Sequence, residues 1–294
     1  VNRKGINDYR SRHGLSKVSF THIIAYAIVR AIADAVPNMR NSYTFDADGK
    51  PLLVRNPHVN VGLAVDVDKG DGTRALVVPV LRDADTLDFA GFLVAYDDII
   101  RKVKANKLTI ADFQGANVSI TNPGTIGTVQ SVPRLMPGQG VIVGVGSIDY
   151  PAEFQGADES NLNTLGVSKV VTVTSTYDHR IIQGAESGLF LKRVHELLLG
   201  EHGFYDNLFR SLDIPYQAVQ WSSDVSPMNR EETMMHKQMQ VSMLVRAHRV
   251  RGHLIADIDP LRWKEPRLPR ELDPAYYGLT IWVLLREFLT GGFA

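Results

Sequence analysis

A histidine at the end of a predicted strand is the first residue of this chain that can do chemistry. His179 follows residues 169–176, a run rich in valine and threonine, and precedes a predicted helix that begins after Gly184. Strand-to-helix turns often present catalytic side chains. Because its free pKa lies near neutrality, a histidine there can take a proton from a thiol or a hydroxyl. A packed histidine that hydrogen-bonds near a strand end is the alternative, and position alone slightly favours it.

A threonine at a second strand end is the other candidate. Residues 117–121 predict a strand, and Thr121 ends it before the turn Asn122-Pro123-Gly124. A hydroxyl at such a position can donate a hydrogen bond to an oxyanion. A plain β-turn, with proline and glycine in their usual places, explains the same residues and is favoured on this pattern alone.

Apolar periodicity predicts the elements that must position these two residues. Strands are expected at residues 59–67, 75–81, 117–121, 141–148 and 169–176. Helices are expected after a Ser19 cap, after a Thr86 cap, and over residues 186–199, where Gly200 closes the helix. These elements make a mixed α/β domain, with the sheet and the packed helices in one layer each, that ends near residue 203.

The chain changes character after this domain. Residues 205–230 carry prolines and serines without sustained periodicity and predict an irregular connector. A helical stripe follows, with apolar residues at Met243, Ala247, Val250 and Leu254. The roughly 60 residues after the connector are too few for an independent core. The chain begins with valine rather than methionine, and we expect it to be a fragment of a longer protein.

The composition excludes several classes of function. Lysine plus arginine and aspartate plus glutamate number 32 each, which indicates neither a nucleic-acid surface nor a binder of anionic membranes. Without cysteine the chain has no disulfide, thiolate zinc site or cysteine nucleophile, so any reacting thiol must come from a substrate. The histidines lack metal-ligand spacing, and we expect no metal site. No signal pattern or membrane-length apolar run is present, and we expect a cytoplasmic protein.

Both candidate residues lie in motifs that resemble the dihydrolipoamide acyltransferases, the core components of 2-oxo acid dehydrogenase complexes and relatives of chloramphenicol acetyltransferase. Residues 179–184, HRIIQG, resemble the family's His-x-x-x-Asp-Gly signature. Residues 119–122, SITN, resemble the Thr-Ile-Thr-Asn element of its succinyltransferase branch. Residues 17–22 and 141–147 are similar to other blocks of that domain. The resemblance implies a chloramphenicol-acetyltransferase-like fold, a mixed α/β sheet with packed helices, over residues 1–203.

The resemblance also implies a mechanism. His179 is expected to act as general base on the thiol of coenzyme A or dihydrolipoamide, and Thr121 to hydrogen-bond the oxyanion. In the family the two residues of one site come from neighbouring subunits of a trimer, so a homotrimer is expected. Asn122, Gln183 and Gly184 are expected to support the site. Gln183 stands where the family usually carries an aspartate that pairs with an arginine near the domain start, so that charge is absent here.

The C-terminal part resembles a different family. Residues 250–257, 259–261, 278–282 and 291–293 are similar to the N-terminal region of the decarboxylase component of 2-oxoglutarate dehydrogenase. Residues 283–285, VLL, depart from the acidic residues usual after the tryptophan there.

The two resemblances together imply the domain organisation of actinobacterial multifunctional 2-oxoglutarate enzymes. Residues 1–203 are expected to be an N-terminally truncated acyltransferase catalytic domain, and residues 204–230 a connector. Residues 231–294 are expected to be the incomplete, mostly helical start of a thiamine-diphosphate-dependent decarboxylase domain.

The expected function is succinyl transfer between dihydrolipoamide and coenzyme A in 2-oxoglutarate oxidation, a part of the tricarboxylic acid cycle. Coenzyme A and the lipoyl group enter as substrates, whereas thiamine diphosphate and magnesium belong only to the full-length chain. No lipoyl domain is recognisable, so a lipoyl domain of another chain and other components of the complex are expected partners. Two alternatives are a non-catalytic core domain that organises the complex and a fragment of a 2-oxoglutarate decarboxylase. The latter lacks the Gly-Asp-Gly and Asn-Asn motif that holds the diphosphate and magnesium.

Overall fold

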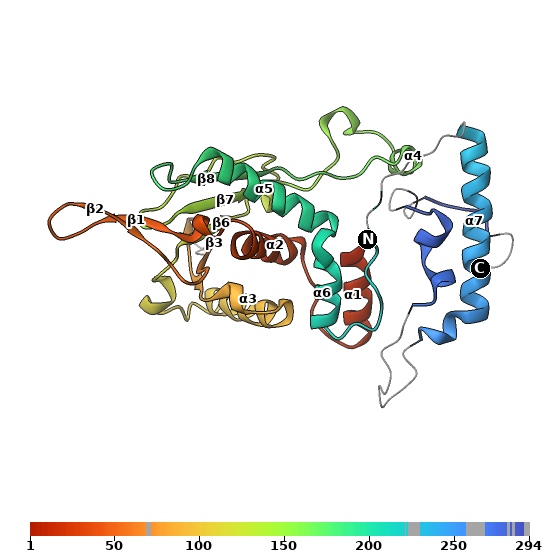
Figure 1. Cartoon of the computed structure of the whole chain (residues 1–294), viewed down its shortest axis with the longest axis horizontal. Coiled ribbons are helices and arrows are strands. Elements are labelled where there is room, and N and C mark those ends of the chain that lie inside the picture. Colours follow the sequence, from red (N-terminus) through yellow and green to blue (C-terminus); the bar gives the residue numbers. More distant parts are fainter. Residues whose placement is uncertain are drawn as a thin grey trace. The chain divides into compact units, whose positions relative to one another are not determined.

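The computed structural model describes residues 1–68, 72–220, 222, 230–256, 268–280, 283 and 286–290 (Figure 1). The chain divides into two compact units. The first holds Val1–Lys17, Tyr150–Lys169 and Gly203–Ala294, and the second holds Val18–Asp149 and Val170–His202. Both candidate residues, Thr121 and His179, belong to the second unit.

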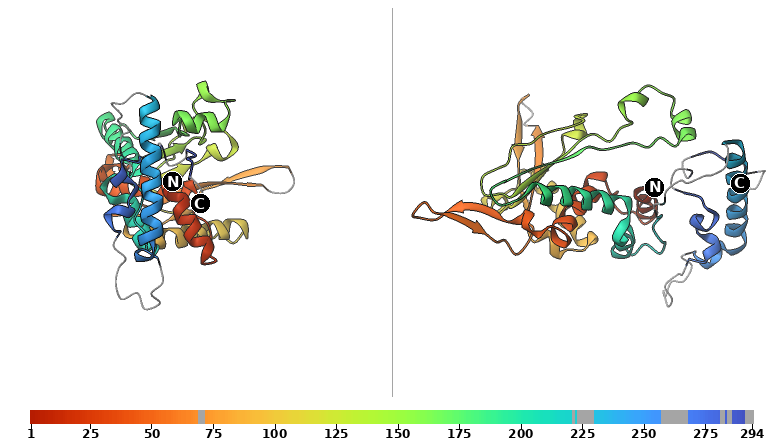
Figure 2. Two further views of the ribbon diagram at one scale, coloured as in Figure 1. Left: turned by 90° about the vertical axis from the view of Figure 1, so that its right-hand side faces the viewer. Right: turned by 45° about the horizontal axis from the view of Figure 1, so that its top comes forward.

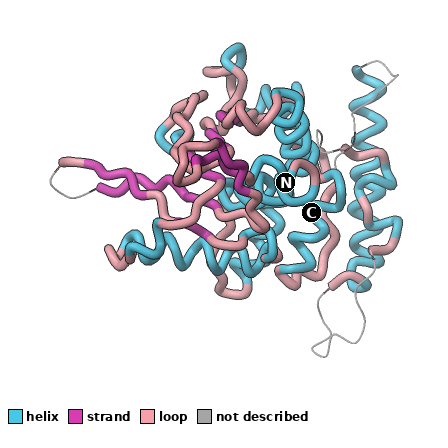
Figure 3. Tube along the Cα trace, turned by 60° about the vertical axis from the view of Figure 1, so that its left-hand side comes forward, coloured by secondary structure: helices cyan, strands magenta, loops and turns pink. Residues whose placement is uncertain are grey.

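A mixed sheet forms the frame of the second unit (Figure 3). Parallel strands lie at its centre, in the order β3, β6, β7, and antiparallel strands flank them. Strand β4 pairs with β3 on one side, the short β5 also pairs with β3, and β8 pairs with β7 on the other side. The strands are β3 (Val61–Asp68), β4 (Arg74–Val77), β5 (Val80–Leu81), β6 (Val118–Thr121), β7 (Val141–Val145) and β8 (Val173–Tyr177).

Three helices form a layer against this sheet: α2 (Phe20–Asp34), α3 (Phe89–Lys104) and α5 (Gly184–Leu199). Helix α3 contacts β3 and β5, α5 contacts β8, and α2 contacts both other helices. Large apolar side chains fill the space between the layers, among them the fully buried Phe92, Phe190 and Ile28. Burial of each such side chain contributes on the order of 1.5–3 kcal/mol. The predicted mixed α/β fold is therefore confirmed.

The helix ends follow from local hydrogen bonding, with one correction. Ser19 caps α2 as predicted, because its Oγ accepts from the His22 N–H at 3.2 Å. The predicted Thr86 cap of α3 is wrong. Asp88 caps that helix by accepting from the Gly91 N–H at 2.8 Å, while the Thr86 hydroxyl donates to the Asp83 carbonyl within a preceding 3₁₀ turn. A carboxylate suits a helix start better than a hydroxyl does, because it also complements the helix dipole.

The strands are shorter than predicted. The run 75–81 splits into β4 and β5 at Pro79, which has no N–H for a ladder, although its carbonyl accepts from the Leu63 N–H at 2.8 Å. The run 169–176 begins as strand only at Val173, and an isolated bridge joins Val170 to Asp149. A further hairpin that was not predicted, β1 (Ser42–Phe45) and β2 (Pro51–Val54), forms a separate two-stranded sheet.

The first unit contains α1 (Asn2–Arg12), α4 (Glu159–Leu165), α6 (Phe204–Ser211) and α7 (Arg230–Arg251). The prediction that residues 205–230 are irregular is wrong at its start, because α6 buries Phe204, Leu208 and Phe209. Helix α6 lies beside α1, and the Tyr9 hydroxyl donates to the carbonyl of Asp213, just after α6.

The long helix α7 forms where a C-terminal helix was predicted, but the predicted apolar stripe is not its packed face, because Met243 and Val250 are 55% and 63% exposed. Instead, Val241 and Leu244 of this helix pack on a small cluster of Tyr277, Leu279 and Val283. Residues 257–267, 281–282, 284–285 and 291–294 lie outside the described residues, and part of the decarboxylase resemblance and of its departure at residues 283–285 depends on them. No helix among the described residues is both long and apolar enough to cross a membrane.

Candidate active site

The turn that carries His179 begins where β8 ends at Tyr177. The Asp178 N–H donates to the Gly140 carbonyl at 2.9 Å, and the N–H groups of Ile181 and Ile182 donate to the Asp178 carbonyl at 3.1 and 2.9 Å. His179 itself is exposed, with its ring 5.5 Å from that of Tyr177. It is therefore not a packed core histidine, and its ring is open to a substrate.

A charged pair on either side of His179 fixes the turn. Arg180 donates hydrogen bonds to the carboxylate of Asp178. Its Nε donates to Oδ1 at 2.8 Å, and its backbone N–H donates to the same oxygen at 3.1 Å. These bonds hold the pKa of the Asp178 carboxyl below its usual range. The guanidinium also lies over the Tyr43 ring, 3.7 Å from its centroid. The sequence prediction left both residues without a role, although an acid and a base on either side of a candidate histidine were visible in it.

A second brace holds the far end of the same turn. The Asn38 amide donates to the Ile181 carbonyl at 2.8 Å and to Glu186 Oε1 at 2.9 Å. The other oxygen of Glu186 accepts from the Gln183 backbone N–H at 2.7 Å. Glu186 thus ties the start of α5 to the segment after α2. Neither Asn38 nor Glu186 was predicted, since they lie 148 residues apart.

Gln183 and Gly184 occupy the boundary between the turn and α5. Gln183 is the N-cap of the helix and is exposed. At Gly184, an added Cβ would lie 3.6 Å from the Tyr177 hydroxyl, which is an ordinary contact. Of the predicted supporting residues on this side, Gln183 contributes through its backbone N–H.

Thr121 ends β6 and is half-buried. The next residue, Asn122, donates from its amide to the Thr21 hydroxyl of α2 at 2.9 Å. Gly124 then meets the backbone of Gly146 so closely that an added Cβ would lie 2.2 Å from its carbonyl carbon and oxygen. The Thr-Asn-Pro-Gly sequence is therefore more than a surface turn, because its glycine packs against the chain just after β7.

The sheet places the two candidate residues at opposite ends of β6 and β8, the two strands that flank β7. Thr121 is level with Gly144 of β7, which is level with Thr174 near the start of β8. Because β8 is antiparallel, the chain then runs away from Thr121 for three more residues to Tyr177, about 10 Å along the strand. His179 lies two residues farther on. One chain does not bring His179 and Thr121 together.

One cluster of metal-ligating side chains occurs in the described part of the chain, formed by Glu196, Glu201 and His202. Arg193 contacts both His202 and Glu196, and Lys192 lies 3.8 Å from Glu196. These cations neutralise the carboxylate, and hydrogen bonding to His202 helps to hold the pKa of Glu196 below its usual range. The cluster is an ion-pair network, separate from the two turns.

Comparison with known proteins identifies the class to which this fold and these turns belong. The sequence profile of the 2-oxoacid dehydrogenases acyltransferase (catalytic domain) family matches residues 2–202. The chain belongs to this family, and its second unit has the fold of an acyltransferase catalytic core.

The similar proteins agree with this assignment. The chain is 52% identical to a multifunctional 2-oxoglutarate metabolism enzyme of Mycobacterium sp. (strain JLS), and the match covers 100% of the chain and 23% of that protein. It is 50% identical to a 2-oxoglutarate dehydrogenase E1/E2 component of Corynebacterium glutamicum, with 99% and 24% covered. The chain thus spans about a quarter of the length of these relatives.

Solved structures show the same fold. A probable dihydrolipoamide acetyltransferase from Listeria monocytogenes superposes with a TM-score of 0.53 at 20% identity, covering 71% of this chain and 78% of that one. A truncated catalytic core of a 2-oxoacid dehydrogenase multienzyme complex from Thermoplasma acidophilum gives 0.52 at 25% identity, with 67% and 81% covered.

Proposed function

We propose that this domain transfers a succinyl group between dihydrolipoamide and coenzyme A, and that His179 and Thr121 of neighbouring copies form each active site. His179 takes the proton of the attacking thiol, and the sulfur forms a bond to the thioester carbonyl carbon. Thr121 donates a hydrogen bond to the resulting oxyanion. When the tetrahedral intermediate collapses, the carbon–sulfur bond of the departing thiol breaks, and that sulfur recovers the proton from His179.

The separation of the two residues carries this proposal. An exposed histidine at one end of the sheet and a threonine at the other make two half-sites on each chain. A site that uses both residues needs a second copy, and a ring in which each copy offers its histidine to the next completes every site. A homotrimer, as the family resemblance implies, is the assembly that we propose.

The contacts around His179 hold its turn in place although Gln183 lacks the charge of the family's usual aspartate. Asp178 and Arg180 hold one end of the turn, and Glu186 holds the other through Asn38 and the Gln183 N–H. A carboxylate is thus already present three residues after Gln183. These contacts support a catalytic domain rather than one that only organises a complex, because an ordered base does not require an aspartate at position 183.

The succinyl preference is supported by the relatives, whose names refer to 2-oxoglutarate, the acid whose decarboxylation leaves a succinyl group. Initial rates with succinyl-coenzyme A and acetyl-coenzyme A, each with dihydrolipoamide, test it. A higher kcat/KM for the succinyl substrate is expected, and equal values would contradict this choice of acyl group.

Subunit mixing tests the shared site. His179→Ala and Thr121→Ala chains, each inactive or nearly so alone, are co-expressed with different tags and the mixed assemblies are purified. About one third of the sites in the purified mixed trimers should then regain both native residues, because a ring of three that contains both variants has one junction at which an intact His179 meets an intact Thr121. A mixture no more active than the better single variant would overturn the two-copy site.

The relatives extend well beyond this chain, and their names support a proposal about the longer protein. Residues 231–294 would be the leading segment of a thiamine-diphosphate- and magnesium-dependent decarboxylase domain, reached through residues 204–230. A lipoyl domain of another chain would deliver the acyl group, and other components of a 2-oxo acid dehydrogenase complex would be partners. Turnover of 2-oxoglutarate with thiamine diphosphate should be absent in residues 1–294, and activity there would contradict this division.

A further inference from the structure

The β1–β2 hairpin is a small sheet that leaves four large apolar residues exposed: Phe45, Leu52, Leu53 and Val54. Phe45 is 58% exposed and Leu53 is 45% exposed. Leu52 and Leu53 point to opposite faces, as neighbours in a strand do, and both are exposed. Figure 2 shows the hairpin standing away from the six-stranded sheet of its own unit. An isolated two-stranded sheet is at best marginally stable in water, so this one needs a partner surface.

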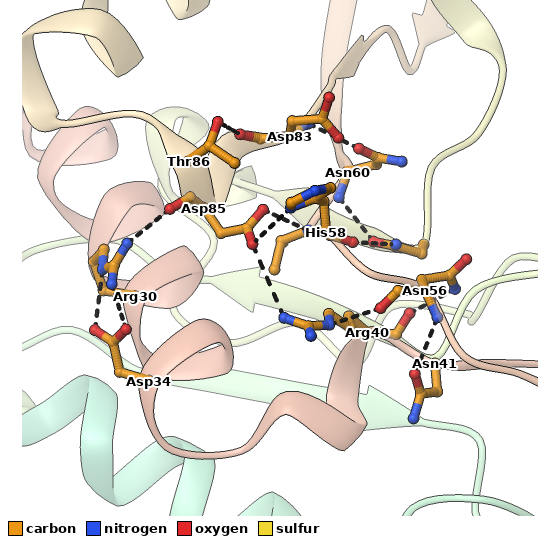
Figure 4. A network of polar contacts seen from close by, with 12 residues as sticks. Arg30, Asp34, Arg40, Asn41, Asn56, His58, Asn60, Asp83, Asp85 and Thr86 are labelled. Atoms are coloured by element: carbon orange, nitrogen blue, oxygen red, sulfur yellow. Dashed lines mark hydrogen bonds and ion pairs between the residues drawn. The ribbon is translucent and has the colours of Figure 1, made fainter.

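Hydrogen bonds nevertheless hold the tip and the base of the hairpin in place. At the tip, Asp46 Oδ1 accepts from the N–H groups of Asp48 and Lys50 at 2.9 and 2.8 Å. At the base, the Asn56 amide donates to the Arg40 carbonyl and the Arg40 Nε donates to the Asn56 carbonyl, both at 2.8 Å (Figure 4). A hairpin that is already ordered loses little conformational freedom when it binds another surface, which favours a specific contact.

The apolar face of the hairpin continues directly from the His179 turn. Tyr43 pairs with Leu53, and Phe45 pairs with Pro51, so these four side chains share one face. Arg180, the residue after His179, lies over the Tyr43 ring of that face. The face therefore extends from the candidate base outward.

We infer that this face, built on Tyr43, Phe45 and Leu53, packs on a second copy of this chain beside the active site that the two copies share. The inference rests on the proposed function. If His179 of one copy meets Thr121 of the next, whatever adjoins His179 must lie beside the surroundings of that Thr121.

Those surroundings offer a matching surface. Ile126, Val129 and Val132 follow Thr121 closely in the chain and are 76%, 61% and 77% exposed. The hairpin face and this loop are different surfaces of one chain, so they form the head-to-tail kind of contact that closes a ring. Strands β1 and β2 carry no charged residue, whereas exposed edge strands are usually guarded by charges.

The test introduces charge into this face and follows assembly and activity. In the double variant Phe45→Lys with Leu53→Lys, native mass spectrometry should show single chains. Succinyl transfer should fall roughly tenfold or more, because a buried interface does not tolerate unpaired charge. Val94→Lys, at a 72% exposed position of α3, is the matched control and should keep the wild-type mass and rate. A double variant that assembles and transfers like wild type would overturn the inference.

A milder variant covers the case in which the charged one does not fold. The chain has no cysteine, so Phe45→Cys introduces a single thiol. At concentrations where the protein is assembled, this thiol should react with a maleimide far more slowly than the thiol of Val94→Cys. Equal reactivity would overturn the inference and leave the shared site standing. A wild-type protein that is a single chain at every concentration would instead remove the shared site itself.

Discussion

The two strand-end turns of the candidate site are built in different ways. The His179 turn leaves its histidine exposed and is held by polar and charged side chains, Asp178 with Arg180 and Glu186 with Asn38. The Thr121 turn is half-buried, and Gly124 sets it directly against the backbone after β7. A base must exchange protons with an incoming thiol, which requires access. An oxyanion donor must keep one fixed position, which close backbone packing provides.

Removal of the base should have the largest effect and tests the difference between the two turns most directly. His179→Ala should lower kcat by about 10²–10⁴, because a positioned general base contributes that much. The unfolding temperature should stay unchanged, since the ring is exposed. His195→Ala, an exposed histidine of α5, is the control and should leave kcat intact. Steady-state kinetics that fail to separate the two variants would remove His179 from the mechanism.

Removing the oxyanion donor should have the next largest effect. Thr121→Val keeps the shape but not the hydroxyl, and kcat should fall by about 10²–10³ with little change in KM. Thr121→Ser keeps the donor and should retain most of the rate. A Thr121→Val variant that keeps the wild-type kcat would show that shape rather than hydrogen bonding matters at this position.

A comparison of two glycines tests whether packing holds the threonine turn. Gly124→Ala should destabilise the domain by roughly 1–3 kcal/mol, because its Cβ would overlap the Gly146 backbone. Gly188→Ala in the middle of α5 has open space around it and should stabilise by about 0.5–1 kcal/mol. Urea unfolding of both variants measures the difference, and a neutral Gly124→Ala would contradict the close packing.

The smallest expected effect concerns the charged brace. Because Arg180 lowers the pKa of Asp178, the ionised carboxylate stabilises the folded state above its ordinary pKa of about 3.9. That contribution disappears as the pH falls through the lowered folded-state value. Asp178→Asn should therefore be less stable than wild type at pH 6, and the two should converge toward pH 3 in unfolding experiments. A difference that does not change with pH would contradict the assigned cause.

The sequence was a good guide to the elements with long apolar stripes and a poor guide to the short ones. Helix α2 is buried on nearly all sides, helix α5 buries one face, and Gly200 ends α5 as expected, in a left-handed conformation. Helix α6 buries only three side chains in eight residues, too few to show a period. The strands of the β1–β2 hairpin expose apolar residues on both faces, so no alternation marked them.

Only those residues of the candidate site that lie in the two recognised motifs were predicted. His179 and Thr121 were visible, but the pattern gave Asp178 and Arg180 no role. Alternate residues of a strand face opposite sides, but the strand ends at Tyr177, and in the turn beyond it these two side chains converge on each other. Asn38 and Glu186 meet only through tertiary packing, which no local pattern encodes.

The placement of His179 and Thr121 at opposite ends of one sheet has a consequence for inheritance. Under the proposed arrangement every polypeptide contributes one residue to each of two catalytic centres and completes neither of them alone. A gene product that still assembles but has lost both residues would silence the centres on both of its flanks, so it would also inactivate sites that it shares with intact copies. Such alleles should behave as dominant, whereas alleles that prevent assembly should be recessive.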